Sequence, residues 1–304
     1  MAFPQIAAIV LRYGQWQKTA TCVDSLLKSA LQPAWVIVVD NASADDSGAR
    51  IETWLAGRAG QRVQVAGGDA CGMPPARLTL IKRKNNAGYA AGNNAGIRLA
   101  REWGADAYLI VNNDARLTSS ALGAMWERLD RGPRPGLCGP LLVYQRPDEP
   151  VQCCAGGFTN YVTGLSTFSG AGLSIAQAQS MEAERIEAGL NFICGACLLV
   201  SSAFIEKVGL MDEGYFLYCE EQDWALRARG KFDLAYAPDA VVYHDEGATT
   251  GWNRYAFQWR SSLRMFRSRL RLAWLHHPWF LPTVFTGCFF AACRLAMKRL
   301  LFGG

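Results

Sequence analysis

Two aspartates stand directly behind apolar, β-branched runs in the first half of the chain. Asp40 follows residues 36–39, and Asp114 follows residues 108–111 after a pair of asparagines. The carboxyl ends of parallel strands meet at one edge of a sheet, where ligands collect, so both aspartates are candidates for one cleft. A carboxylate beside amide oxygens offers the hard ligands that Mg²⁺ or Mn²⁺ prefers. The alternative, equally open for Asp40, is that an aspartate after a strand only caps the next helix.

A segment rich in glycine and asparagine, KNNAGYAAGNNAGI, spans residues 84–97. Small residues let a backbone approach a ligand closely, and asparagine amides both donate and accept hydrogen bonds. The segment lacks the G-K-[ST] ending of a Walker loop and the G-x-G-x-x-G spacing of a dinucleotide site. Taken alone, it is more typical of a glycine-rich turn that opens a helix than of a ligand-binding loop.

Three carboxylates crowd into four residues of FLYCEEQDWALRARG, where Glu220, Glu221 and Asp223 begin a predicted helix. Like charges at this spacing raise one another's pKa, which favours a general base that works near neutral pH. Acidic side chains at a helix N-terminus also complement the helix dipole, and Arg227 and Arg229 lie close enough in sequence to pair with them at the surface. Both interpretations stay open from these residues.

The elements that position these groups follow a β-α-β-α order. Short apolar runs at residues 6–11, 36–39, 78–81 and 108–111 alternate with stretches of helical spacing, which is typical of parallel strands with crossover helices. Residues 57–75 are glycine-rich and are predicted as a surface excursion. We therefore predict an α/β fold with a Rossmann-like, mostly parallel central sheet flanked by helices.

The composition predicts a folded chain with a buried core. Half of the 304 residues are apolar and 19% are charged, which argues against a disordered or fibrous protein. The ten cysteines form no framework, and the C-x-x-C of Cys194 and Cys197 lies in the apolar run NFICGACLLV, so small buried residues are favoured over a zinc site. Many unpaired thiols, and a first segment without a signal-peptide pattern, predict a cytoplasmic location.

The C-terminal segment differs from the rest of the chain. From residue 247 onward there are nine lysines and arginines and no acidic residue, so the overall charge of +5 arises there. Residues 278–293 carry no charge, but this run is shorter than the roughly 20 residues of a spanning helix. The pattern predicts a helical extension on the surface of an anionic membrane, with helices packed on the domain or an oligomer interface as the alternative. No nucleic-acid partner is expected, because the remainder is net acidic and has no binding motif.

The order of these motifs is more informative than any one of them. The chain contains VVDNAS, N-x-G-Y-A-x-G-N-N, NND, GACLLV, GLMDEGYFLYCEEQDWALRARG and APDAVVYH in this order within residues 6–251. Together they resemble glycosyltransferase family 2, and within it the bacterial rhamnosyltransferase-like branch. The resemblance implies a GT-A fold and an inverting, metal-dependent transfer of a sugar from a nucleotide-diphosphate donor to an acceptor hydroxyl.

The resemblance also implies residue roles, position by position. Glu221 occupies the place of the catalytic base. Asp114 ends the D-x-D-like element and would bind Mg²⁺ or Mn²⁺, with His244 as a further ligand or, alternatively, as a structural hydrogen-bonding residue. The donor is expected against Asp40, Asn86, Gly88, Asn93, Asn113 and Asp114. The acceptor side is expected to be shaped by Asp212, Glu213, Glu220 and Asp223.

Three positions depart from the family pattern. Asn112 replaces the first aspartate of D-x-D, so metal binding would rest on Asp114 and the donor diphosphate. Arg12 stands in the first loop, where the family usually has an asparagine–tyrosine pair, and this arginine would alter contacts to the donor. The base is a glutamate instead of an aspartate, which is the milder change because a carboxylate remains.

The resemblance finally implies partners and a division of the chain. Residues 1–252 are predicted as the GT-A domain, with a nucleotide-binding half at 1–130 and an acceptor-binding half at 131–252, and residues 253–304 form the tail. The expected donor is a dTDP-, UDP- or GDP-sugar. The expected acceptor is a glycan or a lipid-linked molecule at the cytoplasmic face of the inner membrane, in polysaccharide or glycolipid assembly. A catalytically silent nucleotide-sugar-binding or scaffold protein is the alternative; a nucleotidyltransferase is disfavoured because the first loop is not glycine-rich.

Overall fold

Five parallel strands form the first half of the central sheet in the computed structural model, which describes residues 3–58, 63–67, 72–245 and 259–290. Their apolar, often β-branched sequences suit strands that are buried on both faces. Each strand is parallel to its neighbour. In spatial order they are β3 (Val63–Gly67), β4 (Leu78–Lys82), β2 (Trp35–Asp40), β1 (Ile6–Arg12) and β5 (Ala107–Asn112).

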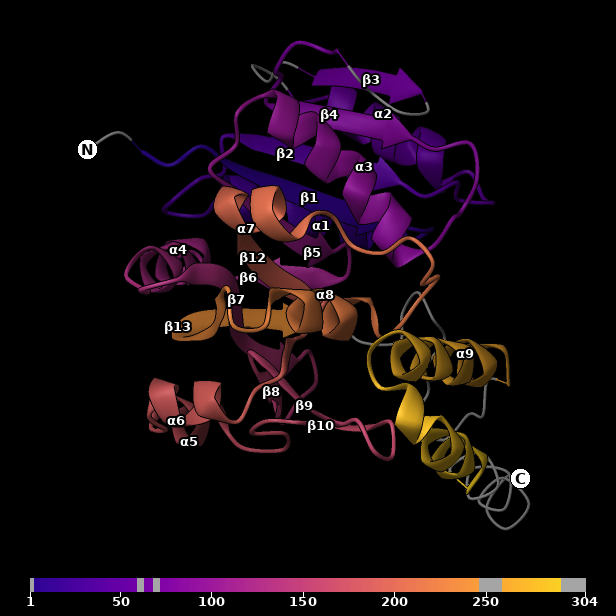
Figure 1. Cartoon of the computed structure of the whole chain (residues 1–304). Coiled ribbons are helices and arrows are strands. Elements are labelled where there is room, and N and C mark those ends of the chain that lie inside the picture. The colour runs from indigo at the N-terminus through magenta and orange to yellow at the C-terminus, as the bar shows by residue number, and fades with distance from the viewer. Residues whose placement is uncertain (1–2, 59–62, 68–71, 246–258, 291–304) are drawn as a thin grey trace.

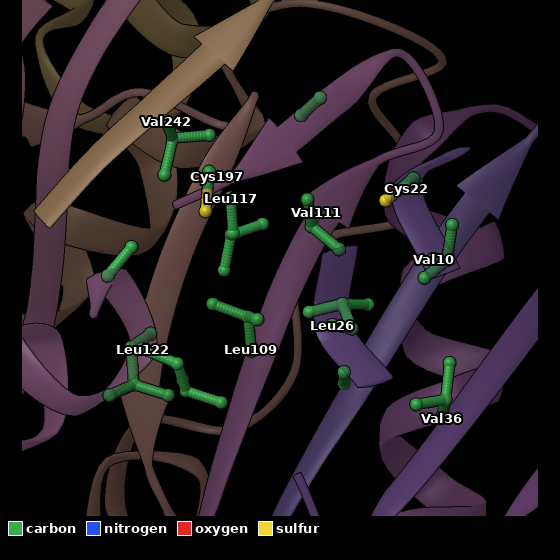
Figure 2. Close-up of a cluster of buried hydrophobic side chains, with 14 of the residues drawn as sticks. Val10, Cys22, Leu26, Val36, Leu109, Val111, Leu117, Leu122, Cys197 and Val242 are labelled. Atoms are coloured by element: carbon green, nitrogen blue, oxygen red, sulfur yellow. The ribbon is translucent and has the colours of Figure 1, made fainter. Parts of the chain in front are cut away.

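Three helices connect these strands and cover both faces of the sheet. Helices α1 (Trp16–Leu27) and α2 (Ser47–Ala56) contribute to one core, and α3 (Tyr89–Glu102) contributes to the other. Two cores form because successive strand residues point to opposite faces, so that Val10 joins the first core and Ile9 the second. Figure 2 shows the first core, with Val36, Leu109 and Val111 of the sheet beside Cys22 and Leu26 of α1.

The second half of the chain widens the sheet with mixed pairing. Strand β12 (Cys197–Ser201) is antiparallel to β5 and to β7 (Pro135–Tyr144). Strand β13 (Asp233–His244) is parallel to β7 and antiparallel to β6 (Ala115–Leu117), and β8 (Val151–Cys154) pairs with β7. The predicted α/β architecture with a mostly parallel sheet is therefore confirmed, with an antiparallel insertion at β12.

Further helices complete the two layers around this wider sheet (Figure 1). Helix α4 (Ala121–Asp130) packs into the same core as α1 and α2, whereas α7 (Ser202–Val208) and α8 (Glu220–Ala228) pack into the core of α3. Trp224 of α8 is fully buried and meets Phe204 of α7 edge to face, with ring centroids 5.1 Å apart. Aromatic pairs of this kind add to the stabilisation that burial supplies, so this contact helps to fix the position of α8.

A small antiparallel sheet lies beside the main one. Strand β9 (Gly156–Asn160) pairs with β10 (Leu165–Phe168) and with β11 (Phe192–Ile193). The short helices α5 (Ile175–Gln179) and α6 (Ala183–Ala188) connect β10 to β11. The glycine pair that opens β9 has a steric reason, because a Cβ on either glycine would lie 2.0 to 2.1 Å from a carbonyl oxygen of a neighbouring strand.

The described part of the predicted tail is helical. Helix α9 (Trp259–His276) is followed by the short helix η1 (Pro278–Phe280), and residues 281–290 are helical as well. None of the described helices is long and apolar enough to cross a membrane. Residues 253–258 and 291–304 of the predicted tail lie outside the described residues.

Candidate active site

The carboxyl ends of β1, β2 and β5 bring several predicted site residues to one edge of the sheet, called the donor edge below. Arg12 at the end of β1 is in register with Asp40 at the end of β2, and Leu11 is in register with Asn112 at the end of β5. Asp114 lies directly before β6. Ligands of open α/β sheets bind at this kind of edge, so the spacing in the sequence correctly placed these side chains near one another.

Asp40 is engaged on both carboxylate oxygens by other residues of the chain. Its Oδ2 lies 2.8 Å from Nη1 of Arg12, and its Oδ1 accepts hydrogen bonds from the N–H and the hydroxyl of Ser43 at 3.1 and 2.6 Å. Burial lowers the pKa of Arg12, although the negative charge of Asp40 acts in the opposite direction. The predicted contact of Asp40 with a base or ribose would therefore share the carboxylate with these internal partners.

The loop before α3 joins the donor edge to the segment before α8. Asn41 donates to the side-chain oxygen of Asn86 at 2.9 Å and to the carbonyl of Gly88 at 3.0 Å. Gly88 has a φ of 97°, and a Cβ there would lie 2.3 Å from the carbonyl oxygen of Phe216. The same carbonyl accepts from the N–H of Tyr89 at 2.7 Å. Glycine alone combines this backbone conformation with this close approach.

The two asparagines inside α3 have different roles. Asn93, which we predicted against the donor, is fully buried; its Nδ2 donates to the carbonyl of Tyr89 at 3.2 Å, and its Oδ1 has no partner in the described chain. Asn94, which was not predicted, donates to the carbonyl of Met211 and to the carboxylate of Glu213, both at 2.9 Å. It also accepts from the N–H of Met211 at 3.2 Å. Asn94 therefore ties α3 to the loop that leads to α8.

Asp114 and His244 face each other at the end of β13. Oδ1 of Asp114 lies 3.3 Å from Nε2 of His244 and forms no hydrogen bond with any described residue. The other ring nitrogen, Nδ1, lies 2.8 Å from the amide oxygen of Gln152. Because that oxygen only accepts, Nδ1 carries a proton, and Nε2 is the ring nitrogen that faces the carboxylate of Asp114.

These side chains fit a divalent cation. A carboxylate oxygen without a partner, beside an imidazole whose second nitrogen is held by an amide, is a typical metal-ligand arrangement. The described residues contain no group of three or more His, Cys, Asp and Glu side chains that could hold an ion, so Asp114 and His244 would need further ligands from water or the donor. Asn113, which we predicted against the donor, donates its amide to the hydroxyl of Thr19 at 3.1 Å inside the fold.

Glu221 opens α8 and contacts the turn before β12. Its Oε1 accepts from the N–H of Gly195 at 3.2 Å, while its Oε2 has no hydrogen-bond partner among the described residues. A Cβ on Gly195 would lie 2.7 Å from this Oε1 and 3.0 Å from the hydroxyl of Tyr89, so a larger residue there would displace these two side-chain ends. Tyr89 donates to the carbonyl of Gly195. Tyr89 and Gly195 belong to the motifs N-x-G-Y-A and GACLLV, but no role was predicted for them, because nothing in the sequence indicates that they contact Glu221.

The turn at Gly195 connects Glu221 to the donor edge. The carbonyl of Ala196 accepts from the N–H of Asn112 at 2.9 Å, and Asp114 follows Asn112 by two residues. One short turn thus contacts the first residue of the Asn112–Asp114 segment on one side and Glu221 on the other. Cys194 and Cys197, which flank this turn, are buried free thiols, in agreement with their prediction as core residues.

Burial raises the pKa of both glutamates at the start of α8. Glu220 is 2% exposed; burial and then the charge of Glu221 raise its pKa well above the ordinary range. Burial also raises the pKa of Glu221, against the effect of hydrogen bonds from backbone N–H groups, including that of Gly195. Glu221 nevertheless keeps partial exposure. It therefore has the accessibility and the raised pKa of a general base that works near neutral pH.

The backbone before this pair adopts a rare conformation. Tyr218 and Cys219, the two residues before Glu220, have φ angles of 73° and 68°. Non-glycine residues in this left-handed region cost roughly 1 to 3 kcal/mol each and persist where surrounding contacts hold them. The segment before α8 is therefore strained, and this strained backbone orients the carboxylates of Glu220 and Glu221.

The other predicted acceptor-side carboxylates have partners within the chain. The pKa of Asp223 is lowered: burial acts to raise it, but hydrogen bonds from His276 and Arg227 outweigh this effect. The pKa of Glu213 is lowered in the same way, with Asn94 and Arg98 outweighing burial. The pairs are Asp212 with Arg271 at 2.7 Å, Glu213 with Arg98 at 2.6 Å, and Asp223 with Arg227 at 2.8 Å and His276 at 2.7 Å.

Comparison with known proteins finds a family and relatives that this chain resembles. Residues 8–151 match the model of glycosyl transferase family 2, so this part of the chain is similar to that family. A curated relative, the N-acetylglucosaminyl-diphospho-decaprenol L-rhamnosyltransferase of Mycobacterium tuberculosis, is 27% identical over 188 residues. These residues make up 57% of this chain and 61% of the relative, so the match spans less than two thirds of that protein.

Solved structures share the architecture at low sequence identity. The structure of GalNAc-T7 with UDP, GalNAc and Mn²⁺ is 12% identical, with a TM-score of 0.64 over 89% of this chain and 48% of that one. The mannosyltransferase PcManGT of Pyrobaculum calidifontis, in complex with GDP-Man and Mn²⁺, is 17% identical, with a TM-score of 0.56 over 96% of this chain and 76% of that one. The predicted GT-A fold is thereby confirmed.

Proposed function

We propose that this protein is an inverting, metal-dependent glycosyltransferase that moves a sugar from a nucleotide-diphosphate donor to an acceptor hydroxyl. One observation carries the proposal. Asp114, Glu221 and the more deeply buried Glu220 each keep a carboxylate oxygen without a hydrogen-bond partner among the described residues, and the turn at Gly195 and Ala196 joins Glu221 to the strand end before Asp114. The oxygen of Asp114 suits a cation on the donor, and that of the partly exposed Glu221 suits removal of a proton from the acceptor.

Glu221 is the proposed general base. Its free Oε2 would take the proton of the acceptor hydroxyl as the acceptor oxygen forms its bond to the anomeric carbon. The bond between that carbon and the diphosphate oxygen breaks in the same displacement, which inverts the configuration. The N–H of Gly195 holds Oε1 of Glu221 in place, so the base needs no reorientation during the step.

Asp114 and His244 are the proposed ligands for Mg²⁺ or Mn²⁺, with the donor diphosphate and water completing the set. A bound cation would neutralise the charge that develops on the departing diphosphate. Asp114 is the one carboxylate in its NND element, so we expect weak binding of metal in the absence of nucleotide. We propose that Asp40, Asn86 and Gly88 contact the nucleotide, with residues 1–130 as the donor half and 131–252 as the acceptor half; the position of Asp40 at the carboxyl end of β2 supports this.

The donor and acceptor are proposed from the relatives. The mycobacterial relative is named as a rhamnosyltransferase acting on a diphospho-decaprenol lipid, which supports dTDP-rhamnose ahead of UDP- and GDP-sugars and a lipid-linked acceptor for this chain. A lipid-linked acceptor places the enzyme at a membrane surface, and we propose the cytoplasmic face of the inner membrane, in cell-surface polysaccharide or glycolipid assembly. The basic, apolar tail is the proposed membrane-associating segment.

Ligand-dependent thermal stability tests the proposal first, because a ligand that binds the folded state raises its melting temperature. The full-length protein is heated with dTDP-, UDP- and GDP-sugars, each with Mg²⁺, Mn²⁺ or a chelator. We expect one donor to raise the melting temperature only with metal, and Asp114→Ala to abolish that rise. The control Asp148→Ala removes an exposed carboxylate and should behave as wild type. A shift that is the same with chelator, or that survives in Asp114→Ala, would contradict the metal assignment.

Turnover separates the enzyme from the alternative of a silent nucleotide-sugar-binding or scaffold protein. The replacement of an aspartate by Asn112 and the pairing of Asp40 with Arg12 are the features that favour this alternative. Donor consumption with membrane extracts as acceptor source should be detectable for wild type and absent for Asp114→Ala. Metal-dependent donor binding without any transfer across such acceptors would support the scaffold.

A further inference from the structure

The hairpin of β9 and β10 exposes large apolar side chains outside the candidate active site. Phe158 is 49% exposed, Val162 43%, Leu165 42% and Phe168 41%. Scattered apolar residues are ordinary on protein surfaces, but a contiguous group marks an interaction site. The hairpin is therefore relevant only if these residues join other exposed apolar side chains.

The hairpin contacts the helical segment at residues 281–290, which also carries exposed apolar side chains. The hydroxyl of Thr283 donates to the carbonyl of Val162 at 2.5 Å, and a Cβ on Gly164 would lie 2.9 Å from the side chain of Val284. Val284 is 1% exposed and Cys288 4%. The helical segment thus buries one face against the hairpin and α9, and Figure 1 shows the hairpin reaching these C-terminal helices.

The outer face of the C-terminal helices remains apolar. A helix that is apolar on both its buried and its exposed side belongs against a further apolar phase. The hairpin and these helices together form a surface that we call the docking face. Phe168 lies on the opposite side of the hairpin from Phe158 and Leu165 and is not part of this face. Besides Phe158, Val162 and Leu165, the exposed members are Trp274, Leu275, Trp279, Phe285, Phe289 and Phe290.

Charge and residue type identify what the docking face fits. Residues 259–290 contain no aspartate or glutamate, and α9 contributes arginines, among them the exposed Arg264 and Arg267. Tryptophan and phenylalanine beside arginine favour the boundary between headgroups and acyl chains of an anionic bilayer. No described helix can cross a membrane, which leaves a bilayer surface as the site of contact for these helices.

We propose that the β9–β10 hairpin is a second membrane anchor, which seats together with the C-terminal helices on the headgroup region of an anionic bilayer. The inference rests on the proposed function in one respect: it states how a lipid-linked acceptor reaches the site. Strand β9 pairs with β11, and the chain continues from β11 directly to Gly195, the contact of Glu221. The hairpin therefore sets the position of the catalytic base relative to the membrane plane.

Vesicle flotation of the full-length protein tests the hairpin. Vesicles contain equal parts of phosphatidylglycerol and phosphatidylcholine, or phosphatidylcholine alone. The test variant is Val162→Glu with Leu165→Glu, and the matched control is Val65→Glu, since Val65 is also 43% exposed but belongs to β3, the edge strand of the main sheet, and not to the small sheet of the hairpin. We expect the test variant to bind anionic vesicles about tenfold more weakly or worse, because burial of one such side chain contributes at least that factor. The control should bind as wild type.

Three results would overturn the inference. The test variant could bind anionic vesicles as well as wild type does, or wild type could bind neither kind of vesicle. The docking face could also join two copies of this chain, in which case sedimentation would show a wild-type dimer that the test variant converts to monomer without any vesicle binding. An unchanged melting temperature verifies that the test variant is folded. Asp114→Ala should float like wild type, so a failure of the proposed catalysis and a failure of the anchor give different results.

Discussion

The donor edge and the first turn of α8 hold their carboxylates by different means. At the donor edge, Asp40 and Asp114 extend from strand ends that the register of parallel strands already fixes. At α8, Glu221 and Asp223 depend on two residues in a rare backbone conformation and on partners far along the chain. In both regions one carboxylate has side-chain partners on both oxygens, an arginine among them, and another keeps an oxygen without a hydrogen-bond partner among the described residues. Carboxylates whose oxygens all have partners within the chain thus stabilise the structure of the site, whereas those with an unpartnered oxygen can bind a ligand or accept a proton. The comparison also shows that the position of α8 depends on residues far away in the sequence.

The largest expected effect comes from exchanging two of the three carboxylates of α8, Glu221 and Asp223, for amides. Glu221→Gln keeps the shape but removes the base, so we expect kcat to fall by about a thousandfold, within the range of general-base contributions, without loss of stability. Asp223→Asn instead weakens hydrogen bonds to His276 and Arg227 and should lower the free energy of unfolding by about 2 kcal/mol. Steady-state rates and urea unfolding of both variants check this. If Glu221→Gln and Asp223→Asn lowered kcat by similar factors, the different roles assigned to these two carboxylates would be wrong.

The next effect concerns stability at the donor edge. Arg12→Ala leaves the buried carboxylate of Asp40 without its cation, and breaking a buried ion pair in this way costs about 3 to 5 kcal/mol. Arg50→Ala is the control, because Arg50 and Asp46 form a surface pair with both side chains more than half exposed, and such pairs contribute about 1 kcal/mol or less. Urea unfolding measures both. Equal midpoints for the two variants would show that the Arg12–Asp40 pair does not stabilise the edge.

Part of this arrangement could be predicted from the sequence. Apolar runs that end in Asp40 and at the NND element identify strands and place their ends at one edge, because parallel strands joined by crossover helices end on the same side of a sheet. The partners of the side chains could not be predicted. Asp212 meets Arg271, and Glu221 meets Gly195, at separations of 59 and 26 residues, and no local pattern encodes such pairs. Strand β3 was missed for a different reason: it lies in the glycine-rich residues 57–75, whose composition is typical of a loop.

The pH dependence of turnover sharpens the contrast within α8. Burial raises the pKa of Glu221, and a base must be deprotonated, so kcat/KM should rise about tenfold per pH unit up to a pKa above the ordinary value of about 4.3. The pKa of Asp223 is lowered in the folded protein. Its ion pairs therefore stabilise the folded state fully above the unfolded pKa of about 3.9, and this stabilisation is lost only as pH falls through the lower pKa of the folded state. As pH is lowered, kcat/KM should therefore fall before the melting temperature does. If both fell over the same pH range, the loss of activity would be caused by unfolding.

The smallest effect tests whether α9 positions the catalytic turn. Arg271 of α9 pairs with Asp212 at 2.7 Å and lies over the ring of Tyr215 at 5.2 Å from its centroid. The hydroxyl of Ser268 donates to the carbonyl of Leu217 at 2.9 Å, directly before the strained pair Tyr218–Cys219.

We expect Arg271→Ala to lower kcat by about three- to tenfold with little change in the KM for the donor, because a partly exposed ion pair contributes about 1 kcal/mol and 1.4 kcal/mol is tenfold in rate. The matched control is Arg267→Ala, which removes the same charge from an exposed position of the same helix. If both variants slow turnover equally, the effect belongs to the charge of the tail and its membrane contact. If only Arg271→Ala slows turnover in the absence of vesicles, α9 positions the segment that orients Glu221. The loss in kcat then measures how much the start of α8 depends on this remote contact.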